Sequence, residues 1–234
     1  SIPAAESVPE VMEAVRLIRK ELNGGVPLIG FSGAPFTLAS YMIEGRPTRD
    51  FAKTKALMFG EPSTWHALMD RLADLVIDYL SEQIDAGIQA VQLFDSWVGA
   101  LSPQDLDEYV LGYSKRIFES LKGRDVPRIH FGTDTATLLE RMASVDCEVV
   151  GVDWRIHLDE AWERIGHDKA IQGNLDPGVL LAGPDVVEAK TKDILKRANG
   201  RRGHIFNLGH GVLPDSKVDN IKRVIDIVHS YRGE

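Results

Sequence analysis

Cysteine is almost absent from this chain, and long apolar runs are missing altogether. A single cysteine, Cys147, stands among 234 residues, which excludes an internal disulfide and fits a reducing compartment. No apolar run approaches the roughly 18 residues that suggest a membrane span. The first residues also lack the basic-then-apolar pattern of a secretory signal. We therefore expect a cytoplasmic protein that does not associate with membranes.

Positive charge is scarce as well. Lys and Arg number 27 against 35 Asp and Glu, the formal net charge is −8, and there is no long Lys/Arg run. Broad nucleic-acid binding is therefore not expected. An anionic small molecule remains compatible with this composition, because one local cationic pocket can outweigh a diffuse negative field.

What the chain does contain is a repeated alternation of short apolar runs with helical patterns. Apolar residues recur at three- and four-residue spacing over 8–22, which predicts a helix. Six brief apolar runs follow, each breaking into Gly, Ser, Asp, Asn or His: VPLIGFSG, AVQLFDSW, PRIHFGT, EVVGVDW, KAIQGNLDP and HIFNLGHG. Further helical patterns occupy 61–86, 103–121, 135–144, 157–166, 184–198 and 215–231. This alternation is typical of a parallel α/β protein.

An open doubly wound sheet and a (β/α)8 barrel share this alternation. Polar and glycine residues collect after all six runs, whereas an open sheet concentrates its site at one switch point. No G-x-G-x-x-G follows the first run, so the main sign of a dinucleotide site is lacking. We therefore predict an α/β fold, a (β/α)8 TIM barrel, as a single domain over residues 1–234. Because six β/α units stand where eight are needed, we expect the first two units to be missing from this chain.

The first candidate site residues follow the first predicted strand. The segment GFSGAPFTLASYMIEG leads from Gly33 at the strand end into a predicted helix that carries Tyr41. Small residues at such a position let a ligand approach the backbone closely. Tyr41 either packs its ring inside the protein or aims its phenol into the barrel mouth, and the sequence leaves both interpretations open.

The second candidate group ends the next strand, in QLFDSWVGALSP. Ser102 and Pro103 have the residue types of a helix N-cap and a first helical position. Asp95 and Ser96 are therefore not needed as caps, and a functional role for them becomes as good an interpretation as a structural one.

Three other strand ends favour structural roles. His130 resembles half of a metal site, but zinc needs three or four ligands and no cysteine or second histidine lies nearby, so we predict a hydrogen-bonded core histidine and no metal. Arg155 could bind a substrate carboxylate, although an ion pair with Asp153 or Asp159 is the favoured interpretation. Asp176, directly before a proline, is predicted to cap a helix.

The segment FNLGHGVLPD places His210 between two glycines at the end of the last predicted strand. Gly209 and Gly211 let the chain bend sharply and hold the histidine out over the barrel mouth. A functional role for His210 is therefore the favoured interpretation.

Four of these segments, GFSGAPFTLASYMIEG, QLFDSWVGALSP, GNLDP and FNLGHGVLPD, resemble in order and spacing the uroporphyrinogen decarboxylase family of haem biosynthesis. The resemblance implies a (β/α)8 barrel that needs no metal, flavin or nucleotide cofactor and usually works as a homodimer. It also implies the reaction, which is removal of CO2 from the four acetate side chains of uroporphyrinogen III to give coproporphyrinogen III.

By the same resemblance, the catalytic and substrate-binding residues are Tyr41, Ser96 and His210, with Phe94 and Gly33 beside the substrate. The chain departs from the family in one respect. The family's Arg-Gln-Ala-Gly-Arg motif, whose arginines handle carboxylates, is absent from this sequence, and so is the aspartate that binds the pyrrole NH groups.

Two alternatives remain open. One is a related corrinoid-dependent methyltransferase barrel, which would need a His-x-Cys zinc pair where this chain has His130-Phe131-Gly132. The other is a non-catalytic tetrapyrrole-binding fragment, which applies if Ser1 is the true start of the protein.

Overall fold

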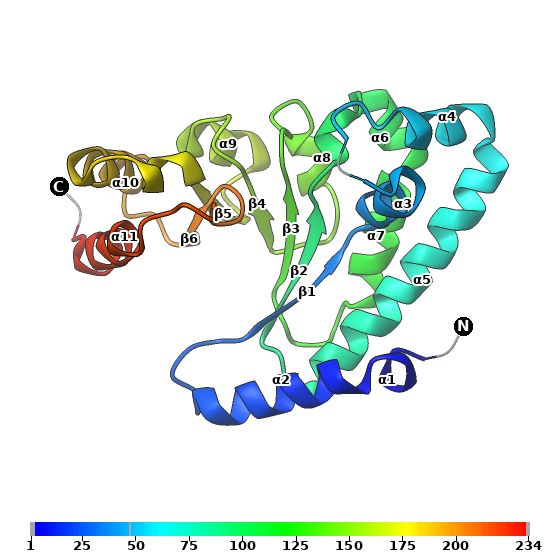
Figure 1. Ribbon diagram of the computed structural model, residues 1–234, viewed down its shortest axis with the longest axis horizontal. Coiled ribbons are helices and arrows are strands. Elements are labelled where there is room, and N and C mark those ends of the chain that lie inside the picture. Colours follow the sequence, from blue (N-terminus) through cyan, green and yellow to red (C-terminus); the bar gives the residue numbers. More distant parts are fainter. Residues whose placement is uncertain (1–2, 47, 233–234) are drawn as a thin grey trace.

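The computed structural model describes residues 3–46 and 48–232, and within them a single sheet of six parallel strands forms the centre of the protein. The strands are β1 (Ile29–Gly33), β2 (Ala90–Asp95), β3 (Arg128–Gly132), β4 (Val149–Gly151), β5 (Ala170–Leu175) and β6 (His204–Leu208). Their order in the sheet is their order in the sequence, and Figure 1 shows the twisted sheet with helices packed along its outer side. All six predicted strands are confirmed, and so is the α/β-barrel class.

Helices connect these strands. The described residues form α1 (Ala4–Ser7), α2 (Pro9–Leu22), α3 (Pro35–Glu44), α4 (Ala52–Gly60), α5 (Pro62–Ala86), α6 (Pro103–Tyr109), α7 (Leu111–Ser120), α8 (Leu139–Ala143), α9 (Leu158–Ile165), α10 (Pro184–Ala198) and α11 (Val218–Ser230), with short 3-10 helices η1 (Val98–Ala100) and η2 (Pro177–Leu181). Every predicted helical range contains one of these helices. No helix in the described part of the chain is long and apolar enough to cross a membrane.

Apart from the short helix α1, which was not predicted, the structure departs from the predicted helices at three places. The range 103–121 is interrupted at Val110, where φ is −135°, so one predicted helix becomes α6 and α7. The range 135–144 shortens to the five residues of α8. Helix α4 was not predicted, because its sequence shows no regular apolar stripe. A buried contact orders its start instead, since the Glu44 carboxylate accepts hydrogen bonds from the backbone N–H and the hydroxyl of Thr54, both at 3.0 Å.

The helix caps predicted at Ser102 and Asp176 are confirmed. The Ser102 hydroxyl accepts a hydrogen bond from the Asp105 N–H at 3.1 Å, directly before the proline that begins α6. The Asp176 carboxylate caps η2 in the same way, by accepting from the Gly178 N–H at 2.8 Å. Asn23 ends α2 in the left-handed conformation, with φ at 44°. Each cap satisfies backbone groups that a helix end leaves without partners.

Side chains on β2 alternate between the two faces of the sheet. Val91 and Leu93 are completely buried in the layer between sheet and helices, where a fully buried side chain of this size contributes about 1.5–3 kcal/mol. Gln92 points to the opposite, concave face. There its side-chain carbonyl accepts a hydrogen bond at 3.2 Å from Gln172 of β5.

An aromatic row covers part of the concave face. Phe94 of β2 meets Phe31 of β1 and Phe131 of β3 edge-on, with ring centroids 5.6 and 5.5 Å apart. Edge-to-face pairs of this kind add about 0.5–1.5 kcal/mol beyond their buried area. The three rings form a continuous apolar surface across the first three strands, which we call the aromatic floor.

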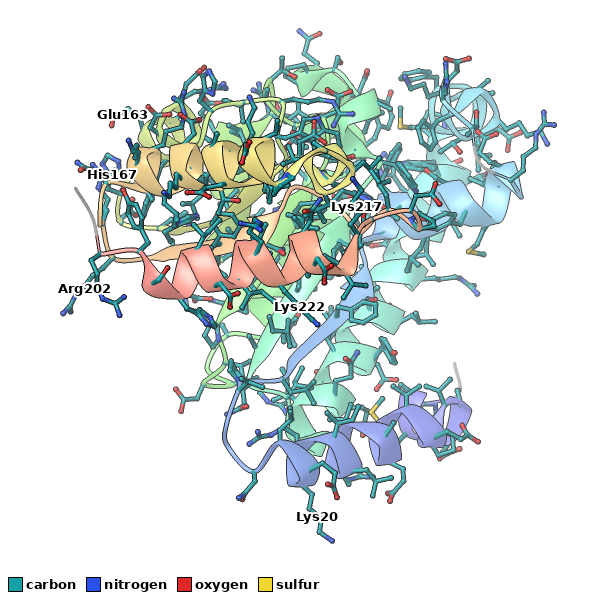
Figure 2. The ribbon with its side chains drawn as sticks, turned by 60° about the vertical axis from the view of Figure 1, so that its left-hand side comes forward. Lys20, Glu163, His167, Arg202, Lys217 and Lys222 are labelled. Carbon is teal, nitrogen blue, oxygen red and sulfur yellow. The ribbon has the colours of Figure 1, made fainter. Side chains whose placement is uncertain are left out.

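The parallel arrangement places all six carboxyl ends of the strands at one rim. In Figure 2, His167 and Arg202, which precede β5 and β6, lie at the left-hand edge of the view, and Lys217, which follows β6, lies near its middle. Loops that follow the strands therefore share one edge, which is where barrel proteins hold their functional residues.

At the opposite rim, Arg128 ties β3 to β4. Its side chain is only 6% exposed, and it donates to the Phe118 carbonyl and to both Glu148 oxygens, at 3.1 and 2.6 Å from Nε and Nη2. The hydrogen bonds with Glu148 raise the pKa of Arg128. Burial opposes ionisation of Glu148, but the Arg128 hydrogen bonds outweigh it and lower the pKa of that carboxyl. This end of the sheet therefore has a structural role.

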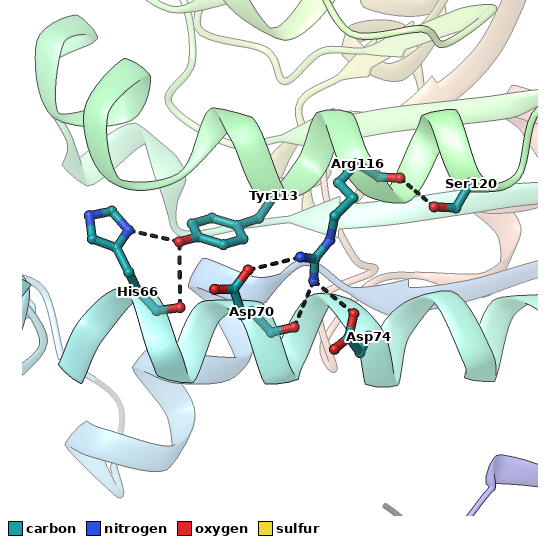
Figure 3. A network of polar contacts seen from close by, with 6 residues as sticks. All are labelled: His66, Asp70, Asp74, Tyr113, Arg116 and Ser120. Carbon is teal, nitrogen blue, oxygen red and sulfur yellow. Dashed lines mark hydrogen bonds and ion pairs between the residues drawn. The ribbon is translucent and has the colours of Figure 1, made fainter. Parts of the chain in front are cut away.

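A second arginine joins two helices on the outer surface. Arg116 of α7 donates to the carboxylates of Asp70 and Asp74 on α5, at 2.8 and 2.9 Å, while Tyr113 and His66 meet one turn away (Figure 3). The Arg116 side chain is 38% exposed. Water therefore screens this contact far more than the one made by Arg128.

Replacing Arg128 with methionine keeps an apolar stem but leaves the buried Phe118 carbonyl without its donor. We expect the free energy of unfolding to fall by roughly 2–3 kcal/mol, somewhat less than for a fully buried pair because Glu148 is half-exposed. Arg116→Met is the matched control and should cost about 1 kcal/mol or less. Urea denaturation measures both losses, and equal losses would contradict the structural role of Arg128.

The Arg128–Glu148 pair also predicts a pH dependence. Because the pKa of Glu148 is lowered in the folded state, its contribution to stability is complete above the pKa of an unfolded glutamate, about 4.3, and disappears as the pH falls through the lower folded value. The stability difference between wild type and Arg128→Met should therefore shrink below about pH 4. Urea titrations at a series of pH values test this, and a difference that stays constant into acid would refute it.

Candidate functional site

A cavity of about 390 Å³ opens at the carboxyl ends of β2 and β6, on the concave face of the sheet. Its lining combines apolar groups with uncharged polar ones and a single histidine: Gln92, Phe94, Ser96, Phe131, Asn207, Leu208, His210, Gly211 and Val212. We call this space the strand-end cavity. Part of the aromatic floor forms its base, and polar side chains stand around it.

Ser96 and His210 come to this cavity from opposite walls. Ser96 directly follows β2, and its carbonyl accepts a hydrogen bond from the Thr133 hydroxyl in the loop after β3. His210 follows β6 and is exposed, with its ring centroid 6.3 Å from that of Phe131. The structure thus brings together Phe94, Ser96 and His210, three of the five residues that the sequence singles out.

The other two line separate cavities. Tyr41 is 57% exposed, so the interpretation that its ring packs inside the protein is wrong. The ring lies edge-on to Trp97 at 6.1 Å and lines a cavity of about 200 Å³. Gly33 lines a third, mostly apolar cavity beside β1. The Tyr41 ring lies against Trp97, the residue that follows Ser96 in the chain.

Gly209 has a different role from the one expected. It does not adopt a positive φ, so its conformation is open to other residues. It is instead buried against the loop after β4: a Cβ on Gly209 would lie 2.8 Å from the Trp154 backbone nitrogen and 3.1 Å from the Asp153 Cα. A Cβ on Gly211 would meet nothing within 4 Å. A close backbone approach therefore requires glycine before His210 but not after it.

Asp95 and His130 lie behind the cavity, on the helix side of the sheet. Asp95 is buried, and its carboxylate accepts a long hydrogen bond, 3.4 Å, from the Thr37 hydroxyl. His130 donates from Nδ1 to the Met142 carbonyl at 3.2 Å, which confirms the predicted core histidine. Its Nε2 lies 3.8 Å from the nearer Asp95 oxygen. Asp95 points away from the strand-end cavity, so of the Asp95–Ser96 pair only the serine reaches it.

Arg155 forms the ion pair that the sequence favours. It donates from Nη1 and from its backbone N–H to the carboxylate of Asp153, and its guanidinium lies 4.5 Å above the ring centroid of Trp154. Asp159 pairs instead with Arg197, at 3.0 Å. Arg155 is therefore held at the rim by its own neighbours.

Across residues 3–46 and 48–232, no three His, Cys, Asp or Glu side chains gather in a way that could hold a metal ion. Cys147 is buried, and burial raises the pKa of its thiol to about 11. A thiolate, the form that binds zinc, is therefore strongly disfavoured at this cysteine.

Sequence reasoning missed five residues of the strand-end cavity: Gln92, Phe131, Asn207, Leu208 and Val212. Gln92 could have been found, because it lies two and four residues before Phe94 and Ser96 and a strand alternates its faces with period two. For Phe131 and Asn207, the sequence alone does not show which side chains of β3 and β6 face the concave side of the sheet. The pairing register decides this. That register sets Phe131 beside Phe94 and Asn207 beside Asn174.

Fold and cavity together define the class as a parallel β/α-barrel protein with a cavity at the carboxyl ends of its strands, which is where barrel proteins hold their functional residues. The comparison with known families is more specific. The chain belongs to the uroporphyrinogen decarboxylase (URO-D) family, whose model matches residues 1–231.

Curated relatives agree with this assignment. A protein named uroporphyrinogen decarboxylase from Streptomyces coelicolor is 55% identical over 225 residues, which cover 96% of this chain and 63% of that protein. One of the same name from Carboxydothermus hydrogenoformans is 50% identical, over 97% of this chain and 65% of that protein. The chain thus spans just under two thirds of the length of these relatives.

Solved structures share the fold at low sequence identity. A methyltransferase from Methanosarcina mazei superposes with a TM-score of 0.82 at 20% identity, over 97% of this chain and 66% of that one. A B12-independent methionine synthase from Shewanella sp. W3-18-1 gives a TM-score of 0.65 at 12% identity, over 93% of this chain and 66% of that one. These similarities concern the fold alone.

The packing of Gly209 predicts a contrast between two neighbouring glycines. Gly209→Ala puts a methyl group against the Trp154 backbone and should cost about 1–3 kcal/mol of stability, as overpacking does. Gly211→Ala should change stability by less than about 0.5 kcal/mol, because its Cβ meets open space. Thermal unfolding of both variants measures the difference, and equal effects would show that Gly209 does not need this close approach.

Proposed function

We propose that this chain acts in a uroporphyrinogen decarboxylase, which removes CO2 from the four acetate side chains of uroporphyrinogen III to give coproporphyrinogen III in haem biosynthesis. The observation that carries the proposal is the meeting of Ser96, Phe94 and His210 in one strand-end cavity, in a chain of this family. We take residues 1–234 as one barrel domain, working in the cytoplasm as a homodimer.

The shape and polarity of the cavity support a tetrapyrrole ligand. Its base is aromatic, so one face of a flat pyrrole ring can pack against Phe94 and Phe131. Its walls offer hydrogen-bonding groups in the side chains of Gln92, Ser96 and Asn207. Apolar cavities with a few convergent polar groups are the usual form of small-molecule sites.

The reaction itself needs no cofactor. Protonating the pyrrole ring makes an iminium-like sink, and the C–C bond to the carboxylate breaks toward it with release of CO2. The exocyclic carbon then takes up a proton to become a methyl group, and loss of the ring proton restores the pyrrole. Each turnover therefore consumes one proton in exchange for one CO2, and the protein must place that proton and orient the acetate.

We assign these orienting tasks to residues of opposite walls. Ser96 binds the acetate that is lost, with Tyr41 reaching it past Trp97, against which the phenol ring now lies. His210, on the β6 side, binds a second acidic side chain of the macrocycle. Gly33 and Phe94 leave room for the ring at the ends of β1 and β2, where they are paired in register.

A corrinoid-dependent methyltransferase is the second candidate, and the chain offers it little support. Such an enzyme needs a zinc thiolate, and position 132 holds glycine where the cysteine should be. The only cysteine, Cys147, is buried, with a raised thiol pKa. Zinc content after dialysis separates the candidates: the decarboxylase proposal expects far less than one zinc per chain, and stoichiometric zinc would contradict it.

Turnover tests the proposal directly. Uroporphyrinogen III, kept reduced, is incubated with the protein, and products with seven to four carboxylates are separated after oxidation. His210→Ala should lower kcat/KM at least about tenfold, or about 1.4 kcal/mol, and most strongly in the later steps. His229→Ala is the matched control, since His229 is exposed near the end of α11, and it should be neutral.

Two outcomes would contradict parts of this account. Unchanged kinetics of His210→Ala on every intermediate would remove His210 from the site. Tight binding of uroporphyrin I without any turnover would replace catalysis by the tetrapyrrole-binding alternative.

A further inference from the structure

We propose that Asp153, at the end of β4, is a positioning residue that holds the two walls carrying Ser96 and His210 in a fixed relation. Its value for catalysis rests on the proposed function, whereas the bracing itself is a property of the fold and is measurable without substrate. Asp153 lines none of the three cavities that contain the candidate site residues.

The carboxylate of Asp153 is buried and fully engaged. Its side chain is 2% exposed. One oxygen accepts hydrogen bonds from the backbone N–H of Asp134, at 2.7 Å, and from Nη1 of Arg155, and the other accepts from the backbone N–H of Arg155 at 3.0 Å. Every partner is a donor, and one carries a positive charge. A buried carboxylate needs hydrogen-bond donors of this kind to offset the loss of water.

The first link runs from Asp153 to the Ser96 wall. Asp134 and Thr133 form the loop after β3, and the Thr133 hydroxyl donates to the Ser96 carbonyl. The loop also lies directly on Gly99, where a Cβ would clash with the Thr133 carbonyl oxygen. Asp134 has a left-handed φ of 58°, a conformation that its hydrogen bond to Asp153 stabilises. Movement of this loop would therefore disturb the turn that carries Ser96.

The second link runs from Asp153 to the His210 wall. Gly209 sits on the Asp153–Trp154 peptide, close enough that a Cβ would clash with it. The Gly209 N–H donates to the Leu175 carbonyl at 2.7 Å. The Asn174 amide in turn donates to the Asp153 carbonyl at 2.9 Å. The backbone around Asp153, which the Asp153 side chain holds in place, therefore sets the position of Gly209. His210 is the next residue in the chain, so its position depends on the same contact.

Asp153→Asn disrupts the hydrogen bonds of the Asp153 carboxylate without changing the size of the side chain. Both carboxylate oxygens face N–H donors, so an asparagine must point its NH2 group at a donor whichever way the amide is turned. The matched control is Asp134→Asn. The Asp134 carboxylate is 67% exposed and lies 3.7 Å from Nε of Arg155, while the Asp134 backbone N–H remains available to Asp153.

Amide hydrogen exchange of the intact protein gives the decisive readout. In Asp153→Asn we expect exchange to accelerate at least about tenfold in two separate segments, 133–135 and 207–212, including the Gly209 amide. In Asp134→Asn we expect rates within about twofold of wild type. Acceleration confined to 133–135 and 153–155 would show a purely local role and overturn the proposal.

A milder variant covers the case in which Asp153→Asn fails to fold. Arg155→Gln removes the charged partner of Asp153 but keeps the backbone donor, so a smaller acceleration at the same two segments is expected. An unchanged exchange rate of the Gly209 amide in this variant would contradict the proposal that Asp153 holds the two walls in place.

A binding cycle then separates positioning from simple destabilisation. If Asp153 acts through His210, the losses of uroporphyrin I affinity in Asp153→Asn and His210→Ala should be strongly non-additive in the double variant. Additive losses would reject action through His210. If wild type binds no uroporphyrin I, the proposed function fails, and the exchange data still decide whether Asp153 braces the two walls.

Discussion

Parallel pairing of six strands in sequence order is the constraint on which the rest of the structure depends. Because all neighbours run the same way, every strand ends at the same rim, and residues distant in sequence meet there. Because side chains alternate, Phe94 and Ser96 face the concave side while Asp95 between them faces the helices. A shift of the β2 register by one residue would exchange these roles and dismantle the cavity.

Much of this architecture follows from the sequence. Short apolar runs ending in Gly, Ser, Asp or His predict all six strands, and Ser102 and Asp176 predict the helix caps, since both signals are local. The break at Val110 and the formation of α4 are not predictable in this way. Val110 lies inside an otherwise regular helical pattern, and α4 owes its start to Glu44, a residue of a different helix.

The candidate site residues also separate into those that local sequence signals predict and those that they do not. Ser96 and His210 stand out because each follows a strand without a capping role. Phe131 and Asn207 depend on which face each strand turns to the concavity, and that is decided by the pairing register. For Tyr41 the sequence left two interpretations open, because it could not show that the ring lies against Trp97 at the surface. The site thus combines residues that local sequence signals predict, and the pairing of strands distant in sequence brings these residues together.

A buried charged side chain supports each rim of the sheet. Arg128 stabilises the amino ends of β3 and β4, whereas Asp153 connects the loops at their carboxyl ends. A titration of isotope-labelled protein with uroporphyrin I, followed by NMR, tests most directly the proposal that the strand-end cavity binds a tetrapyrrole. Shifts concentrated at Phe94, Ser96 and His210, with none around Arg128, are predicted. Shifts that cluster anywhere else, or no shifts at all, would contradict the account.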